Sequence, residues 1–265
     1  MSTLDDLFAR LWEDYAQLNP EARRIHDLLR GRGDEIRNDH IALRTFDDPR
    51  VGIDALTASF RARGYVAKAE YAFEEKKLFA RHYEHPDVER PLVFASELRL
   101  GEMSESFRST VARLLAEMPV DLPRRFDFSV AGRPWSISSA DYERLRRESE
   151  YGAWVAAFGF RANHFTVSVN ALTSFSGIEE LDRFLEANGY ALNCADGAIK
   201  GSSEDLLEQS STLAGEADVE FRDGVRRIPA CYYEFARRYP QPDGRLFRGF
   251  IEKSANRIFE STDRR

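Results

Sequence analysis

Cysteine is scarce in this chain of 265 residues, which contains only Cys194 and Cys231. Two thiols cannot build a dense disulfide framework or a cysteine-rich zinc motif. The chain also lacks an apolar run of the roughly 20 residues needed to cross a bilayer. Its opening stretch, MSTLDDLFARLWEDYAQ, has neither the basic nor the apolar region of a signal peptide. These absences predict a cytoplasmic protein without a membrane segment.

Positive charge is also in deficit, with 38 Lys and Arg against 45 Asp and Glu, a net charge of −7. Such a balance argues against broad affinity for nucleic acid, although local arginines can still bind acidic small molecules. No P-loop, glycine-rich dinucleotide loop or Ser-His-Asp arrangement is present. Hydrophobic content of 43% and charged content of 31% are ordinary for a globular protein. We therefore predict one compact domain, 1–265, whose partners are small molecules.

The chain contains an internal repeat. GIDALTASFRARGY at 52–65 and GIEELDRFLEANGY at 177–190 align without a gap and share six of fourteen positions. Each segment is typical of a short amphipathic helix that ends at a left-handed glycine, Gly64 or Gly189. A helix followed by Gly-Tyr is also a common way to end a helix, so the match alone leaves a chance similarity open.

What precedes the two helices favours a true repeat. His40 lies in RNDHIALRTF, and His164 lies in ANHFTVSVN, at nearly the same distance before each helix. Both stretches alternate like strands, which places each histidine on the face opposite the strand's large apolar residues. In the first strand, Ala42 and Arg44 share the face of His40.

Further strands are predicted after each helix. The predicted strands are 65–73, 76–85 and 90–98 in the first half, and 190–194, a polar stretch and 227–239 in the second. These patterns predict an α+β fold of two pseudo-symmetric βαβββ modules, 36–98 and 161–239, which form a curved, mostly antiparallel sheet.

The remaining segments are predicted to be helical. Two helices, 3–18 and 20–31, precede the first module. The connection 99–160 carries helices 104–118 and 139–158, and the region 240–265 carries a C-terminal helix at 246–261.

A metal site is the central functional hypothesis. If the modules pack about a pseudo-two-fold axis, His40 and His164 converge from equivalent strands. Glu234, in RIPACYYEFARRY, is a carboxylate in an apolar strand, and burying it without a cation would be costly. Two histidines and one carboxylate form the triad typical of non-haem Fe(II) oxygenases. Each histidine alone could instead be a hydrogen-bonded core residue.

Other polar residues suggest the surroundings of this site. Glu97, in the last strand of the first module, could be a fourth metal ligand, a group that supports a ligand, or an ordinary residue at a strand end. We expect a supporting group or a salt-bridge partner. Arg44 could bind a substrate carboxylate bidentately, or form a salt bridge to Glu97 or Glu234. A polar cluster could either line the substrate pocket or form a turn: Gln209, Ser210, Ser211 and Thr212. The remaining histidines are predicted to be structural (His26) or on the surface (His82 and His85).

These motifs resemble known families. The paired modules resemble the vicinal oxygen chelate superfamily, which includes glyoxalases and extradiol dioxygenases. More closely, NDHIALRTF, ANHFTVSVN, EQSSTLA, IPACYYEFARRY and GFIEKSANRIFEST resemble the 2-oxoadipate dioxygenase/decarboxylase family, also called hydroxyglutarate synthases. The resemblance implies that His40, His164 and Glu234 bind Fe(II). It implies that Arg44 binds the carboxylate of the substrate.

The implied reaction converts a 2-oxo dicarboxylic acid such as 2-oxoadipate, with O2, into 2-hydroxyglutarate and CO2. A glyoxalase-like isomerase or hydrolase that uses Zn or Ni on the same fold is the alternative. A third possibility is a non-catalytic binding module in which the metal is structural.

Overall fold

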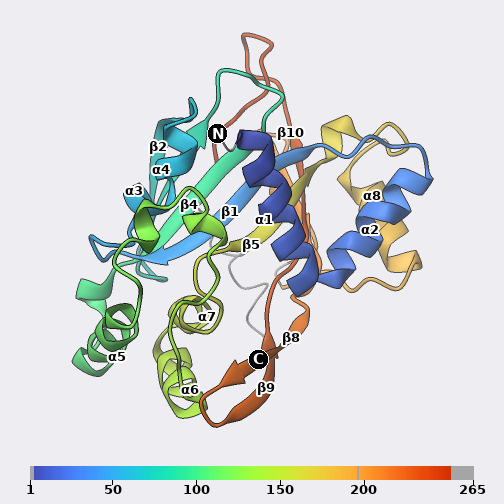
Figure 1. Ribbon diagram of the computed structural model, residues 1–265. Helices are drawn as coiled ribbons and strands as arrows, with labels where there is room; N and C mark the ends of the chain where they lie inside the picture. The colour runs from blue at the N-terminus through green and yellow to red at the C-terminus, as the bar shows by residue number, and fades with distance from the viewer. Residues whose placement is uncertain (1–2, 196, 252–265) are drawn as a thin grey trace.

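The computed structural model describes residues 3–195 and 197–251, which form one eight-stranded sheet, a small hairpin and surrounding helices (Figure 1). The order of strands in the large sheet is β2-β3-β4-β1-β5-β10-β7-β6. Its strands are β1 (Asn38–Phe46), β2 (Val66–Phe73), β3 (Leu78–Glu84), β4 (Leu92–Leu98), β5 (Ala162–Ser168), β6 (Lys200–Ser202), β7 (Leu207–Ser211) and β10 (Glu234–Arg238). The hairpin comprises β8 (Glu216–Phe221) and β9 (Gly224–Pro229).

The helices precede, join and follow these strands. They are α1 (Leu4–Leu18), α2 (Pro20–Gly31), α3 (Ile53–Leu56), α4 (Ala58–Arg61), α5 (Glu105–Ala116), α6 (Ser139–Glu148), α7 (Glu150–Phe158) and α8 (Ile178–Ala187). Four short 3-10 turns are η1 (Leu100–Glu102), η2 (Leu122–Arg124), η3 (Phe128–Val130) and η4 (Val169–Ala171). Within the described residues, none of these helices has the length and apolar character that a bilayer crossing requires.

Two modules related by a pseudo-two-fold axis make the large sheet, as the sequence predicts. The first module extends from the centre as β1-β4-β3-β2, and the second as β5-β10-β7-β6. At the centre β1 and β5 run antiparallel, so that His40 lies opposite Thr166 and His164 lies opposite Ala42. The pairs β1–β4 and β5–β10 are parallel, and the other neighbouring pairs are antiparallel. The predicted α+β fold class is therefore confirmed.

The register shows which residues of the two modules are equivalent. On β4, Phe94 lies opposite Ala42, and on β10, Glu234 lies opposite Thr166. Ala42 and Thr166 each follow a repeat histidine by two residues, so Phe94 stands in the first module where Glu234 stands in the second. The glutamate in the first module, Glu97, is thus not the counterpart of Glu234.

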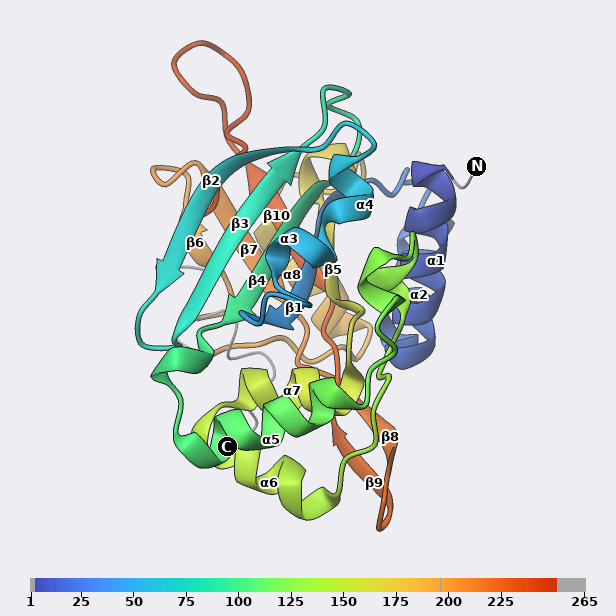
Figure 2. The same cartoon turned by 60° about the vertical axis from the view of Figure 1, so that its left-hand side comes forward.

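One face of the sheet is covered by helices. The rings of Trp12 and Tyr15 on α1 lie 5.3 and 5.0 Å from the ring of Phe165. α1 begins where the sequence predicts because Thr3 forms a reciprocal capping box with Asp6. Helices α5, α6 and α7 lie together beyond one end of the sheet (Figure 2). The face that carries His40 and His164 is left for the site.

Two predicted helices are each divided. The helix predicted at 139–158 breaks at Ser149, whose extended backbone ends α6 and whose hydroxyl caps α7 by accepting from the Gly152 amide. The helix predicted at 52–65 divides into α3 and α4 at Thr57, whose hydroxyl donates to the carbonyl of Ile53. Hydroxyl bonding to the preceding turn competes with regular helix geometry.

The strands of the second module also differ from the prediction. The predicted strand 227–239 is two strands, β9 and β10, with buried residues 230–233 between them. Side chains rather than a neighbouring strand donate to carbonyls of this intervening segment. The indole N–H of Trp154 donates to the carbonyl of Ala230, and the hydroxyl of Tyr15 donates to the carbonyl of Tyr232. The predicted strand 190–194 is wrong, because that stretch makes only one bridge, from Leu192 to Thr212. The corresponding strand is β6.

The predicted C-terminal helix is not present in its described part. Residues 246–251 are not helical, and the remainder of 246–261 lies outside the described residues. Arg238 donates to the carbonyls of Phe247 and Gly249. These carbonyls would accept backbone hydrogen bonds if the segment were helical. The ring of Phe250 instead packs at 4.8 Å from the ring of Phe94.

The predicted surface position of His82 is wrong. His82 is 2% exposed, because β3 is paired on both sides and the residue lies opposite Phe94 on the same face as His40. Its Nδ1 lies 2.8 Å from the hydroxyl of Tyr71. His85 is half-buried against the carbonyl of Arg63, and His26 packs against the ring of Trp12, as expected for a structural residue.

Burial of His82 predicts acid sensitivity. Burial lowers the pKa of His82 from 6.5 to about 4. Between these values the unfolded chain binds a proton that the folded chain does not, so stability falls as the pH falls. We expect the free energy of unfolding at pH 4.5, relative to pH 7.5, to drop by about 2 kcal/mol more in the wild type than in His82→Gln. Urea unfolding of both proteins at each pH measures this, and equal pH dependence would contradict it.

Candidate metal centre

Three ligand-type side chains meet on the open face of the sheet. His40, His164 and Glu234 come from β1, β5 and β10, which are consecutive neighbours. Each offers one atom, and these atoms all lie within 4.8 Å of one another. The Nε2 atom of His40 lies 3.3 Å from Oε1 of Glu234, and Nε2 of His164 lies 3.5 Å from Oε2. The predicted convergence of the three residues is confirmed.

The donor set fits a divalent metal ion. Imidazole nitrogens and carboxylate oxygens bind metals at about 2.0–2.2 Å, which places neighbouring ligand atoms about 3 Å apart. All three side chains are buried, and Glu234 is 0% exposed. Within the described residues, Oε2 of Glu234 has no hydrogen-bond partner. A buried carboxylate oxygen of this kind is costly unless a cation compensates it.

The residue before each histidine holds its second ring nitrogen. Oδ1 of Asp39 lies 2.8 Å from Nδ1 of His40, and Oδ1 of Asn163 lies 3.0 Å from Nδ1 of His164. A carboxylate only accepts, so the Nδ1 of His40 donates, and its Nε2 faces Glu234. The repeat contains this arrangement twice.

Electrostatics differ between the two histidines. Burial alone would lower the pKa of His40, but hydrogen bonds to Asp39 and Glu234 raise it above its usual value. Burial, with smaller contributions from His40 and Arg44, lowers the pKa of His164 well below its usual value. His164 is therefore neutral near pH 7, and its Nε2 lone pair is available for coordination.

Two further side chains bind the carboxylate of Glu234. Nε2 of Gln209 donates to Oε1 at 2.7 Å, and Oγ1 of Thr166 donates to the same atom at 3.2 Å. Thr166 also lies 3.1 Å from Nε2 of His40. Sequence reasoning missed Thr166, although it follows His164 by two residues and so shares its face of the strand.

The predicted polar cluster divides between the two faces of the sheet. Ser211 lies opposite Glu234 on the open face, whereas Ser210 faces the helices and donates to Asp182 on α8 at 2.6 Å. The predicted substrate contact by Ser210 does not fit this placement. Thr212 accepts a hydrogen bond from the amide of Tyr233 at 3.0 Å. Gln209 donates to the carboxylate of Glu234, as described above.

Arg44 is buried on the face of the three ligand residues. Its guanidinium lies 5.0 Å from the ring of Tyr151 and 5.3 Å from the ring of Trp154, both on α7. Glu97 pairs with Thr45 in the register and therefore faces the other side of the sheet. There it accepts from the Ile53 amide at 2.8 Å, at the start of α3. Glu97 thus supports a helix terminus, and its predicted roles beside the metal or Arg44 are wrong.

Aromatic rings enclose the centre. The ring of Tyr232 stacks on His164 at 4.5 Å, and the ring of Phe250 meets His40 edge-on at 4.9 Å. Phe250 belongs to the segment 247–250, whose position the sequence did not predict. These rings leave His40 and His164 only 2% and 5% exposed.

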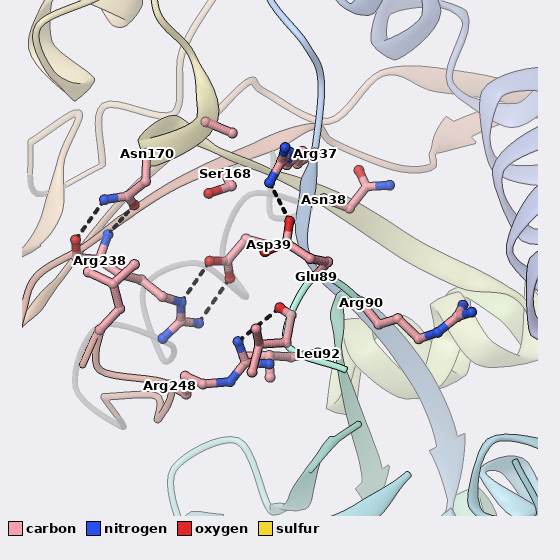
Figure 3. A pocket seen from close by; sticks show the side chains of 13 residues that line it. Arg37, Asn38, Asp39, Glu89, Arg90, Leu92, Ser168, Asn170, Arg238 and Arg248 are labelled. Atoms are coloured by element: carbon pink, nitrogen blue, oxygen red, sulfur yellow. Dashed lines mark hydrogen bonds and ion pairs between the residues drawn. The ribbon is translucent and has the colours of Figure 1, made fainter. Parts of the chain in front are cut away.

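A pocket of about 220 Å³ is lined by Asp39, the residue that precedes His40, and by Arg238 (Figure 3). Arg238 reaches Asp39 from this pocket and binds both carboxylate oxygens, at 2.6 and 2.9 Å. Burial alone would raise the pKa of Asp39, but Arg238 and His40 hold it well below its usual value. The pocket lining includes Arg37, Asn170 and Arg248, and none of the three ligand residues belongs to it.

Removal of the ligand charge gives a direct test. Glu234→Gln keeps the shape of the side chain but removes the buried charge, so we expect loss of stoichiometric Mn(II) binding while the circular dichroism spectrum is retained. Isothermal titration of the apo protein measures the binding. The matched control is Glu208→Gln, because Glu208 lies on β7, bonds to Tyr239 and should not affect metal binding. Wild-type affinity in Glu234→Gln would remove Glu234 from the ligand set.

Comparison with known proteins supplies the family. The family model of 2-oxoadipate dioxygenase/decarboxylase matches residues 127–248. The chloroplastic 2-oxoadipate dioxygenase/decarboxylase of Arabidopsis thaliana is 34% identical, over 94% of this chain and 74% of that protein.

Solved structures agree with this match. A protein of Shewanella frigidimarina that carries the name hydrolase is 47% identical, with a TM-score of 0.91 and coverage of 95% of this chain and 99% of that one. The hydroxyglutarate synthase of Oryza sativa, solved with 2-oxoadipate, is 32% identical, with a TM-score of 0.89 and coverage of 97% and 90%. A glyoxalase superfamily protein of Ralstonia eutropha shares the fold at 23% identity, with a TM-score of 0.77 and coverage of 92% and 84%. The chain belongs to the 2-oxoadipate dioxygenase/decarboxylase family.

Proposed function

We propose that this protein is an Fe(II)-dependent enzyme that converts 2-oxoadipate or a closely similar 2-oxo diacid, with O2, into 2-hydroxyglutarate and CO2. One oxygen atom of O2 enters the new carboxylate at the former keto carbon, the other becomes the hydroxyl group, and the C1 carboxylate leaves as CO2, so that atoms balance without a second organic substrate. The observation that carries the proposal is the buried set of His40, His164 and Glu234 in a member of this family.

The three ligand residues would bind the metal ion and leave part of its coordination sphere open to substrate. Two imidazoles and one carboxylate would hold Fe(II) in the arrangement of non-haem oxygenases, with positions left for other ligands. When bound, Fe(II) would supply a chelating site for the carboxylate and ketone of the 2-oxo acid and the electrons that activate O2. Asp39 and Asn163 hold the two imidazoles so that each Nε2 faces the centre.

Arg44 is the proposed clamp for the distal carboxylate. It shares a strand face with His40, and four residue steps along β1 place their Cα atoms about 13 Å apart. The rings of Tyr151 and Trp154 hold the guanidinium plane. Because Arg44 is 2% exposed, its attraction for a carboxylate is screened less than at a surface. A diacid would thus be held at both ends.

The surrounding rings of Tyr232 and Phe250 exclude water from this chemistry. They cover His164 and His40 on the open face of the sheet. Exclusion of water strengthens polar contacts at the centre and protects reactive species from side reactions. Ser211, on the same face as Glu234, is a further candidate for contact with substrate.

The metal and the cellular location are further parts of this proposal. Zn or Ni could occupy the same donor set in the purified protein, since histidine and carboxylate ligands also bind these ions. We propose a cytoplasmic location on the basis of the sequence alone, whereas the plant relatives are named as chloroplastic.

Oxygen consumption tests the reaction. The apo protein, loaded with Fe(II) without air and then given 2-oxoadipate in an oxygen electrode, should consume one O2 for each CO2 and each 2-hydroxyglutarate formed. Glu234→Gln is the inactive control. Consumption of substrate without O2 uptake would favour the isomerase or hydrolase alternative.

Arg44→Ala tests the clamp. We expect the KM for 2-oxoadipate to rise by the equivalent of about 2–4 kcal/mol, because the distal carboxylate loses its charged partner. The monoacid 2-oxohexanoate, which has no distal carboxylate, serves as the matched substrate and should show little change. Equal effects on both substrates would assign Arg44 another role.

A further inference from the structure

Arg238 connects the metal centre to the segment 247–250. It lies four residues after Glu234 on β10, on the same strand face, and is 5% exposed. Through Nε and Nη2 it binds both oxygens of Asp39, and Asp39 in turn accepts from Nδ1 of His40. A bidentate pair of this kind fixes both position and orientation. Asp39 therefore orients the imidazole of His40, and Arg238 in turn orients Asp39.

The remaining nitrogen of Arg238 holds the chain that covers the site. Nη1 donates to the carbonyl of Phe247 at 3.0 Å and to the carbonyl of Gly249 at 2.8 Å. The guanidinium lies 5.2 Å from the ring of Phe250, and that ring meets the ring of His40 at 4.9 Å. One guanidinium thus contacts the support of a ligand histidine and the backbone that places Phe250 over that histidine.

The second histidine lacks this connection. Asn163 holds His164 in the equivalent way, but it is neutral. Within the described residues its Nδ2 has no hydrogen-bond partner. The repeat therefore supports both imidazoles, yet only the support of His40 is charged and tied to another segment. A salt bridge needed only for folding gives no reason for contacts to the carbonyls of 247–250.

We propose that Asp39 and Arg238 are positioning residues that hold His40 ready for the metal and couple metal binding to the placement of the segment 247–250 over the site. The inference rests on the proposed function, because it assumes a metal at His40, His164 and Glu234. Metal bound at Nε2 draws electron density from the imidazole and strengthens the bond from Nδ1 to Asp39. Asp39 in turn holds Arg238 in place. Arg238 then keeps its hydrogen bonds to the carbonyls of Phe247 and Gly249.

The first measurement is Mn(II) affinity, which does not depend on turnover. We expect Asp39→Asn to weaken Mn(II) binding by about 10- to 100-fold, the range found when such supporting groups are removed. Arg238→Lys keeps the charge but loses the bidentate geometry, and it should weaken binding by a smaller factor. Arg37→Lys is the matched control, because Arg37 lines the same pocket but pairs with Glu35 and Glu89.

The second measurement is amide hydrogen exchange of peptides that cover 247–250, with and without Mn(II). In the wild type and in Arg37→Lys, Mn(II) should slow exchange in this segment. In Asp39→Asn and Arg238→Lys that metal-dependent protection should be lost, which a salt bridge needed only for folding would not predict. Should Asp39→Asn fail to fold because Arg238 loses its partner, the double variant Asp39→Asn with Arg238→Gln removes both charges and should show the same two losses.

The outcomes separate the two proposals. If the wild type binds no Mn(II), the proposed metal function itself fails. If the wild type binds Mn(II) and the folded Asp39 variant binds it equally well, the positioning role is overturned. Unchanged metal-dependent protection of 247–250 in Arg238→Lys would overturn the coupling.

Discussion

The whole arrangement depends on a carboxylate that water cannot reach. Glu234 is 0% exposed in the interior of a sheet, where an uncompensated charge would cost several kcal/mol. Gln209 and Thr166 donate to one oxygen only. Positive charge must complete the environment of the other oxygen, and the two histidines that flank it are suited to hold a cation there. The residues around the centre follow from this requirement, since each either orients a ligand or excludes solvent.

The duplicated module explains how two histidines far apart in the sequence come to lie at one centre. Each first strand carries a histidine preceded by Asp or Asn, and antiparallel pairing of β1 with β5 brings the two together. In both modules the residue before the histidine forms a hydrogen bond with Nδ1, and this bond holds the imidazole in its orientation. Helices cover the opposite face, as shown by α1 on Phe165, so the polar ligand residues gather on the face of the two histidines.

Much of this could be predicted because strand alternation and a repeat are local signals. His40, His164 and Glu234 were found in this way. Residues whose role depends on register were not, because register across strands does not follow from spacing along one strand. Glu97 and Ser210 both lie one residue out of phase with the open face. The break between β9 and β10 was missed because distant side chains, Trp154 and Tyr15, take its carbonyls.

The two halves of the sheet are alike in backbone but not in charge. At the position where β10 presents an acid, β4 presents the ring of Phe94. A symmetric pair of acids would have given four protein ligands, and two carboxylates would have cancelled the whole charge of a divalent ion. Because Phe94 stands there, the first module supplies one ligand residue, His40, whereas the second supplies two, His164 and Glu234. The broken symmetry therefore confines the acid to one side of the paired histidines, while the other side is apolar, where Phe94 packs against the ring of Phe250.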